Sequence, residues 1–491
     1  MFGKRILKNT GVQAVGKVIT VGLSFFTLSL TTRYLGPEQY GVLSTVTVFL
    51  SFFAISSDLG LSLFGLRELA QSRQDAKAIL SSLLSLRLVM SLVSAVLALI
   101  IGFFLGYSRE FLYGLLLMSP TLLFNTATSA ISIYFQHNLH MRYVVTGEVV
   151  AKAATLAGLI YVVHNHLGLN SIFLLNAFGA GVFTLAVYIF ARSHIQMGLN
   201  FNFHYWRKAL WLSIPLGLAS VLNSVYYRLD TIMLSLLNLA NSIVPHVSNF
   251  EAVGLYQVPY RLIEVIMIFP GLFITSVFPV MAAQSDLGEV WQKRTQKAYD
   301  FLLMFAVPLV VFVVMFSPQI IRVIAGTGYE VSAELLRVLI FAVALSFLNA
   351  LLGFLLVARH RERDVLNLAI VTIILNFLLN LVLIPRFSYY AAAYMSVFSE
   401  FLCLAASLWF ARQRFHFVPG HMVLAKSALV ALLAAPAVYW LPRFAVGVTS
   451  HVFLITCLAA GLYALVYFGL LIPVRVIDPA EVRHLLKPSN K

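Results

Sequence analysis

The chain has 491 residues, of which 60% are hydrophobic and only 11% are charged, and its mean hydropathy is +0.90. A soluble domain could not cover so much apolar side chain with polar surface, so the composition excludes a soluble globular protein. The formal net charge of +15 would suit a nucleic-acid partner, but the basic residues follow the loops of a membrane protein, and we expect no nucleic acid.

Stretches of apolar sequence recur along the whole chain, separated by short polar breaks. Each is long enough to cross a bilayer as a helix, which takes about 20 residues, and none shows the alternating apolar and polar pattern of outer-membrane strands. We therefore predict an all-α membrane protein with about fourteen transmembrane helices, at residues 11–32, 42–65, 82–105, 111–135, 146–164, 170–191, 208–237, 252–281, 299–325, 334–357, 364–385, 388–410, 423–442 and 450–473.

The basic residues are distributed unevenly between the two sides of this pattern. Of the 34 lysines and arginines, 23 lie in the termini and the even-numbered breaks, and the odd-numbered breaks hold five: Arg33, Arg109, Arg322, Arg386 and Arg443. The positive-inside rule then places both termini in the cytoplasm. We predict a multi-pass protein of the cytoplasmic (inner) cell membrane.

The first half of the chain can be aligned with the second half in two blocks. The aligned identities are Gly41 with Gly254, Ala70 with Ala283, Gln71 with Gln284 and Ser72 with Ser285 at a shift of 213 residues, and Asn125 with Asn349 at a shift of 224. The hydropathy repeats as well, as in many transporters. It gives six spans, a basic break between Arg192 and Lys208, six more spans and a final pair.

This repeat predicts two pseudo-symmetric six-helix lobes and a C-terminal helix pair. The N-terminal lobe comprises residues 1–200, the C-terminal lobe residues 201–415, and the helix pair with a cytoplasmic tail residues 416–491. The last two spans have no charged residue in their apolar cores. They either face lipid or line a groove for a lipid tail.

Ionisable side chains occur inside many of the spans. Each costs at least about 2.5 kcal/mol on insertion scales and is a functional candidate by default. The candidates for lining a substrate-binding cavity are Lys17, Arg87, Lys152, Arg228, Arg261, Asn125 and Asn349. The candidates for coupling or charge balance are Asp58, Glu148, Asp230, Glu264 and Glu400.

Helical spacing limits which of these residues can pair. Arg228 and Asp230 are two residues apart, which places them about 200° apart around a helix and prevents easy pairing. Two other pairs have the spacing of an intrahelical ion pair, an alternative to a functional role: Arg261 with Glu264, and Glu148 with Lys152.

Polar residues form stripes along several spans, and two of the stripes include a charged residue. The stripes either line a cavity or hydrogen-bond to neighbouring helices. They comprise Asn9, Gln13, Lys17 and Ser24; Ser44, Thr47, Ser51 and Asp58; Asn125, Ser129, Ser132 and Gln136; and Thr372, Asn376 and Asn380.

Signatures of enzymatic chemistry are absent from the sequence. It contains no G-x-x-x-x-G-K-[ST] phosphate loop and no His/Cys metal cluster, and its two cysteines, Cys403 and Cys457, both lie inside predicted spans. We expect a protein that is not an enzyme and that has no cofactor and no metal.

Two regions resemble a known family. RYLGPEQYG (Arg33 to Gly41), SDLGL (Ser57 to Leu61) and LRELAQ (Leu66 to Gln71) resemble the amino-terminal pattern of the polysaccharide-transporter, Wzx-type flippases. These belong to the multidrug/oligosaccharidyl-lipid/polysaccharide exporter (MOP) superfamily. YRLDTIML, followed by VGLYQVPYRL (Val253 to Leu262), resembles the start of that family's second lobe.

The resemblance implies a flippase that moves a polyprenyl-diphosphate-linked oligosaccharide from the cytoplasmic to the outer leaflet. The cargo would serve synthesis of a cell-surface polysaccharide such as a lipopolysaccharide O-antigen, and transport would use alternating access through a cationic central cavity. The implied partners are the lipid-linked oligosaccharide, membrane lipids, and a polysaccharide polymerase or glycosyltransferases.

Three alternatives remain open. An ion-coupled multidrug exporter of the same superfamily typically has twelve spans and an acid in the first, whereas the first span here holds Lys17 and no acid. A lipid II flippase shares the fourteen-span plan and a basic cavity. A membrane scaffold for polysaccharide enzymes would give the charges inside the spans no role.

Overall fold

The computed structural model describes residues 2–71, 76–195, 197–239, 242–244, 247–282, 288–359, 361–439, 452–471 and 473–474, and every regular element in these ranges is a helix. The helices divide between two compact units, Met1–Gly254 and Leu255–Lys491. The first unit holds α1 (Phe2–Asp58), α2 (Leu61–Gln71), α3 (Ala76–Phe104), α4 (Arg109–Met118), α5 (Pro120–His137), α6 (Arg142–His164), α7 (Gly168–Arg192) and α8 (Phe203–Leu236). Helix α9 (Asn249–Ile266) begins in the first unit and ends in the second.

Helix α1 contains two of the predicted spans. Its backbone leaves the helical region at Gly36, with φ of 71°, and the following Pro37 starts the second arm. The second arm ends at Asp58, earlier than the predicted residue 65, because Leu59 and Gly60 both have positive φ and the chain restarts as α2.

The α1–α2 junction packs directly against the backbone of α8. A Cβ atom on Gly60 would lie 2.5 Å from the Ser213 carbonyl oxygen and 2.6 Å from the Gly217 nitrogen. Only a residue without a side chain allows this approach at positive φ. The main chains of the junction and of α8 are therefore in direct contact.

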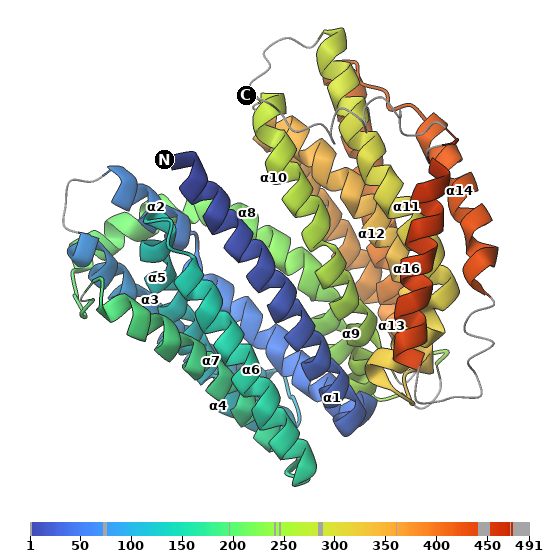
Figure 1. Ribbon diagram of the computed structural model, residues 1–491. Coiled ribbons are helices and arrows are strands. Elements are labelled where there is room, and N and C mark those ends of the chain that lie inside the picture. Colours follow the sequence, from blue (N-terminus) through green and yellow to red (C-terminus); the bar gives the residue numbers. More distant parts are fainter. Residues whose placement is uncertain are drawn as a thin grey trace. The chain divides into compact units, whose positions relative to one another are not determined.

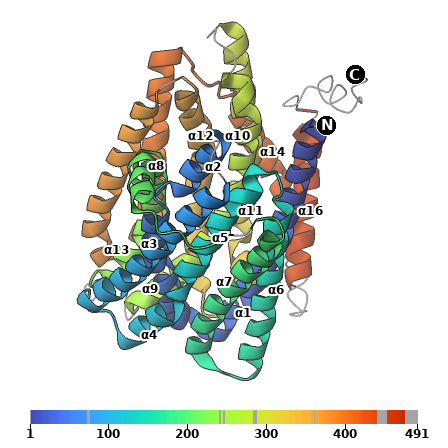
Figure 2. The same cartoon turned by 90° about the vertical axis from the view of Figure 1, so that its left-hand side faces the viewer.

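Neighbouring helices of the first unit run side by side. Helix α6 packs along α7 and α1, and α3 packs along α5 (Figure 1). Figure 2 shows the α6–α7 pair from the side.

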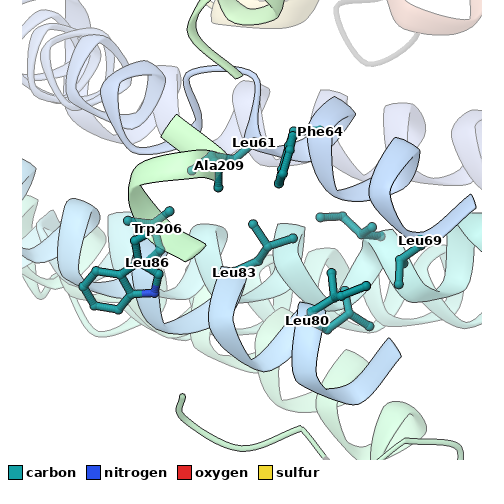
Figure 3. Close-up of a cluster of buried hydrophobic side chains, with 10 residues drawn as sticks. Leu61, Phe64, Leu69, Leu80, Leu83, Leu86, Trp206 and Ala209 are labelled. Carbon is teal, nitrogen blue, oxygen red and sulfur yellow. The ribbon is translucent and has the colours of Figure 1, made fainter. Parts of the chain in front are cut away.

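A buried apolar cluster joins α2, α3 and α8 (Figure 3). Trp206 of α8 lies in this cluster and donates a hydrogen bond from its indole Nε1 to the Ser82 carbonyl, 3.1 Å away. Partnering of the indole N–H is what a buried tryptophan requires. The labelled members are Leu61, Phe64, Leu69, Leu80, Leu83, Leu86, Trp206 and Ala209.

The described residues of the second unit comprise the rest of α9 and six further helices. They are α10 (Ile268–Ala282), α11 (Glu289–Ala325), α12 (Glu330–Ala358), α13 (Glu362–Phe415), α14 (Met422–Tyr439) and α16 (Val452–Leu471). Helix α12 packs along both α11 and α13 (Figure 1). Helix α13 contains the predicted spans 364–385 and 388–410, and its backbone breaks at Ser388, with φ of 51°.

The C-terminal helices α14 and α16 pack on α11 and on each other. One face of α14 is buried through Val430, Ala431 and Ala434, whereas Leu432 and Leu433 are exposed. The exposed face suits lipid contact. Most of the predicted cytoplasmic tail lies outside the described residues, as do Ser72 and its aligned partner at 285.

The predicted fold class is confirmed. Among the described residues nine helices are long and apolar enough to cross a membrane. Two of the nine, α1 and α13, contain two predicted spans each, and α8 together with the shorter α14 and α16 covers the remaining ones. The two-lobe division at residue 200 stays a prediction.

Candidate functional site

Four polar side chains meet in the first unit and form what we call the charged cluster: Asp58, Ser62, Arg87 and Ser129. The Arg87 Nη2 atom donates to the Asp58 carboxylate and also to the Ser62 hydroxyl, 2.9 Å away. The Ser62 hydroxyl lies 2.8 Å from Asp58 Oδ1 and 3.3 Å from the Ser129 hydroxyl. The cluster therefore joins α1, α2, α3 and α5.

The break between α1 and α2 positions the acid of this cluster. Asp58 is the last residue of α1, and its Oδ1 atom accepts a hydrogen bond from the Ser62 backbone N–H, 3.3 Å away in the first turn of α2. A carboxylate at a helix N-terminus is stabilised by the unpaired backbone N–H groups and the helix dipole. The Asp58 Oδ1 atom thus accepts from three donors: the Ser62 backbone N–H, the Ser62 hydroxyl and the Arg87 guanidinium group.

The Arg87 side chain is 1% exposed, whereas the Asp58 side chain is 45% exposed. Within the described part of the chain the Arg87 Nε and Nη1 atoms are buried without a hydrogen-bond partner. These two atoms carry three of the five guanidinium N–H groups. Such unsatisfied donors are costly to bury, and most of the hydrogen-bonding capacity of Arg87 is unused within the described chain.

Hydroxyl pairs surround the charged cluster. The Ser56 and Ser94 oxygens lie 2.8 Å apart and join α1 to α3. The Ser57 and Thr126 oxygens lie 3.3 Å apart and join α1 to α5. These contacts are of the kind that hold membrane helices together.

A second polar group, the amide cluster, lies in the second unit and consists of Asn349, Asn376, Asn380, Ser399 and Glu400. The Asn349 Nδ2 atom donates to Glu400 Oε2 at 2.7 Å and to the Glu400 carbonyl at 2.9 Å. Asn376 donates to the Ser399 hydroxyl at 3.0 Å, and Asn380 donates to Asn376 Oδ1 at 3.1 Å.

All members of the amide cluster except Asn349 are buried. The Asn376–Ser399 bond links the two arms of α13 on either side of the break at Ser388. The stripe Thr372, Asn376 and Asn380 is therefore an element of helix packing in this unit.

An aromatic cluster forms a third group, in the first unit. The Tyr107 ring stacks on Phe111 with centroids 3.9 Å apart, and Phe49 and Phe250 lie within 6.4 Å of Tyr107. The Tyr107 hydroxyl lies 2.7 Å from the Ser235 hydroxyl at the end of α8. This cluster joins α1 and α4 to α8 and the start of α9.

Several of the twelve candidate residues predicted from the sequence meet in the part of the chain that the structure describes. They form three pairs: Asp58 with Arg87, Asn349 with Glu400, and Arg261 with Glu264, whose ion pair spans 2.8 Å. The remaining six lie as follows: Lys17 exposed on α1, Asn125 exposed on α5, Glu148 and Lys152 half-buried on α6, Arg228 half-buried on α8, and Asp230 buried on α8.

Sequence reasoning missed Ser62 in the charged cluster, Ser399 in the amide cluster and all members of the aromatic cluster. Ser62 follows the SDLGL motif directly, and Ser399 precedes Glu400. The signal that could have found each serine was a nearby ionisable residue, Asp58 for Ser62 and Glu400 for Ser399.

Sequence profiles of two families match long parts of the chain. The profile of the polysaccharide biosynthesis protein family matches residues 6–284, and that of the lipid II flippase MurJ matches residues 160–458. Each covers more than half of the sequence. The chain belongs to the flippases of the MOP superfamily. The resemblance seen in the sequence motifs is thereby confirmed.

Relatives of this flippase occur among archaeal membrane proteins. A probable low-salt glycan biosynthesis flippase of Haloferax volcanii is 20% identical over 392 residues, which cover 78% of this chain and 79% of the relative. An uncharacterized membrane protein of Methanocaldococcus jannaschii is 23% identical over 231 residues, covering 45% of this chain and 44% of that protein.

Solved structures of this superfamily share the flippase fold. The lipid II flippase MurJ in an inward closed conformation superposes with a TM-score of 0.73 at 14% identity and covers 98% of this chain and 100% of its own. An inward-facing multidrug resistance MATE transporter of the MOP superfamily superposes with a TM-score of 0.61 at 14% identity. The match covers 82% of this chain and 98% of the transporter. Both similarities concern the fold alone.

Proposed function

We propose that this flippase moves a polyprenyl-diphosphate-linked oligosaccharide from the cytoplasmic to the outer leaflet of the cytoplasmic membrane, for synthesis of a cell-surface polysaccharide. The observation that carries the proposal is the buried Arg87, whose Nε and Nη1 atoms have no partner in the described chain. The polysaccharide biosynthesis family and the Haloferax relative support a glycan cargo.

The chemistry of the cargo fits the guanidinium group. A diphosphate presents several anionic oxygens, and arginine binds such oxygens with two parallel N–H donors. Asp58 neutralises part of the Arg87 charge. Binding of the diphosphate would then exchange one anion for another rather than create a new buried charge.

The remaining cationic candidates, Lys17, Lys152, Arg228 and Arg261, would complete a cationic path. Asn125 and Asn349 would supply hydrogen bonds to the glycan. The acids Glu148, Asp230, Glu264 and Glu400 would balance or couple these charges. Both termini would lie in the cytoplasm, since the basic residues concentrate in the even-numbered breaks.

We further propose transport by alternating access of an N-terminal and a C-terminal lobe, which requires contacts that can separate. Two contacts of the first unit join segments of the two sequence repeats. Gly41 of α1 and Gly254 of α9, aligned in the repeat, approach backbone to backbone. The Tyr107–Ser235 hydrogen bond joins the α3–α4 connection to α8.

Transport of a labelled polyprenyl-diphosphate glycan across proteoliposome membranes tests the proposal. We expect the purified full chain to move the glycan into the opposite leaflet and to do so more slowly after Arg87→Ala. A multidrug substrate serves as the comparison cargo, and selective transport of that compound would favour an exporter instead. The absence of any transport, with the protein folded, would favour a scaffold for a polymerase or glycosyltransferases.

A second candidate function is the transport of lipid II, because the MurJ profile matches residues 160–458. Lipid II is also a polyprenyl-diphosphate glycan, so the same cationic residues would serve it. Competition between labelled lipid II and an unlabelled oligosaccharide carrier in the same vesicles separates the two cargoes.

A further inference from the structure

The connection between α7 and α8 presents large apolar side chains outside the helices. Residues 197–202 are not helical, and in LNFNFH (Leu199 to His204) apolar and polar residues alternate. In extended chain such alternation directs Leu199 and Phe201 to one face, and Phe203 begins α8. Leu199, Phe201 and Phe203 are 61%, 56% and 72% exposed.

Hydrogen bonds to α3 hold this connection in place. The Gly198 backbone N–H donates to the Ser81 hydroxyl at 3.1 Å, and the Asn200 backbone N–H donates to the Ser85 hydroxyl at 2.7 Å. The Asn202 side chain then caps α8 by accepting from the Tyr205 N–H at 3.0 Å. The connection is therefore a fixed strap rather than a loose loop.

The Phe201 and Phe203 rings both lie against the buried Trp206 ring. The Phe201 and Phe203 rings lie 5.8 and 4.9 Å from the Trp206 ring. They thus form one patch. An exposed apolar patch of this kind marks an interaction surface.

Positive charge surrounds the patch. Arg192, Arg207 and Lys208 are all exposed, and the sequence contains no acidic residue between Glu148 and Asp230. Among the described residues, Glu68 reaches this region and pairs with Lys208 at 3.1 Å. Arg192 and Arg207 complement an anionic surface.

We propose that residues 197–203, the strap, form an interfacial anchor that inserts Leu199, Phe201 and Phe203 into the anionic leaflet of the bilayer, with Arg192 and Arg207 at the lipid phosphates. Apolar insertion combined with basic residues at the headgroups is how peripheral anchors bind acidic lipids. Because Ser81 and Ser85 bind the strap, it fixes the depth of α3, the helix that carries Arg87. The inference is independent of the transported cargo.

Single cysteines test the position of the strap in the full-length protein. In a Cys403→Ala/Cys457→Ala background, a bimane label is attached at Phe201→Cys, at Phe203→Cys, or at Asn200→Cys as the matched control on the polar face. The protein is placed in nanodiscs of phosphatidylcholine with equimolar phosphatidylglycerol. We expect lipid carrying a doxyl group near its headgroup to quench the label at 201 and 203 several-fold more than at 200, and aqueous iodide to show the opposite order.

Equal access of iodide to all three labels would overturn the proposal and would indicate a surface left for a soluble partner. A second measurement uses the unmodified protein. We expect a higher Tm in nanodiscs containing phosphatidylglycerol than in phosphatidylcholine alone, and loss of most of that difference in Arg192→Gln/Arg207→Gln. Equal Tm values for the unmodified protein in the two lipids would contradict the role of the anionic headgroup.

Discussion

Gly41 and Gly254, two residues that the sequence repeat aligns, meet each other in the structure. A Cβ atom on Gly41 would clash with the Phe250 carbonyl, and one on Gly254 would clash with the Pro37 carbonyl. The backbones of α1 and α9 therefore touch at the same position of the two repeats. Contact at equivalent positions is expected where a pseudo-twofold axis relates two halves.

Replacement of Gly41 by alanine should separate these helices. We expect Gly41→Ala to lower the free energy of unfolding by about 1–3 kcal/mol, the usual cost of overpacking, and to slow transport. Denaturant titration in detergent measures the first effect. Gly22→Ala is the matched control on α1, because a Cβ atom there meets nothing within 4 Å; it should be neutral or stabilising by up to about 1 kcal/mol. Equal effects of Gly41→Ala and Gly22→Ala would contradict a close approach of α1 and α9 at Gly41.

Removal of the Tyr107–Ser235 hydrogen bond should destabilise the contact between α8 and the α3–α4 connection. A double-mutant cycle with Tyr107→Phe and Ser235→Ala should give a coupling energy of about 0.5–1.5 kcal/mol. Burial raises the pKa of Tyr107 to about 12. The contribution of the protonated hydroxyl to stability is therefore complete below the ordinary tyrosine pKa of about 10. This contribution is lost as the pH rises through the raised pKa of about 12. A coupling energy near zero at neutral pH would show that the bond does not form.

The same pair tests whether the contact opens during transport. In the background without native cysteines, Tyr107→Cys/Ser235→Cys joined by a thiol-specific crosslinker should stop transport, and reductive cleavage of the linker should restore it. Either cysteine alone, treated with the same reagent, is the control. Full transport by the crosslinked protein would exclude an opening at this position.

Asp58→Asn should expose the cost of burying Arg87 without a counter-ion. We expect a loss of about 1–3 kcal/mol of stability, since the amide keeps the bonds to Ser62 but loses the ionic contact. The double variant Asp58→Asn/Arg87→Met removes the buried charge as well and should recover stability. If Arg87 binds the cargo, this stable double variant should still be defective in transport. Recovery of both properties would assign the pair a purely structural role.

The aligned asparagines Asn349 and Asn125 should respond differently to alanine. Asn349→Ala leaves the buried Glu400 carboxylate without its amide donor and should cost about 1–3 kcal/mol. Asn125 is exposed on α5, so Asn125→Ala should change stability by no more than about 0.5 kcal/mol. Thermal unfolding of the two purified variants measures the difference, and a reversed order would contradict the placement of the amide cluster.

This asparagine pair also shows what the sequence could and could not predict. The fold followed from local properties, because the length of the apolar stretches located the spans. The spacing of Arg261 and Glu264 also indicated their ion pair. By contrast, the repeat aligned Asn125 with Asn349 but could not predict that only Asn349 meets an acid, because Glu400 is brought to it by packing of α12 against α13.

The charged cluster was beyond sequence reasoning for the same cause. Asp58 and Arg87 were both candidates, but they lie 29 residues apart on different helices. Their pairing depends on the break at Leu59 and Gly60, and on the packing of α2 between α3 and α8. No helical periodicity encodes such a contact, since periodicity relates residues of one helix only.

The rate at which Arg87 variants move a labelled polyprenyl-diphosphate oligosaccharide across proteoliposome membranes is the most direct test of the proposed function. Loss of charge-assisted hydrogen bonds worth about 1.5–3 kcal/mol predicts a rate roughly 10- to 100-fold lower for Arg87→Ala. Arg87→Lys should fall between, because lysine keeps the charge but not the planar donor fork. An unchanged rate for folded Arg87→Ala would contradict a role of this buried cation in carrying the diphosphate.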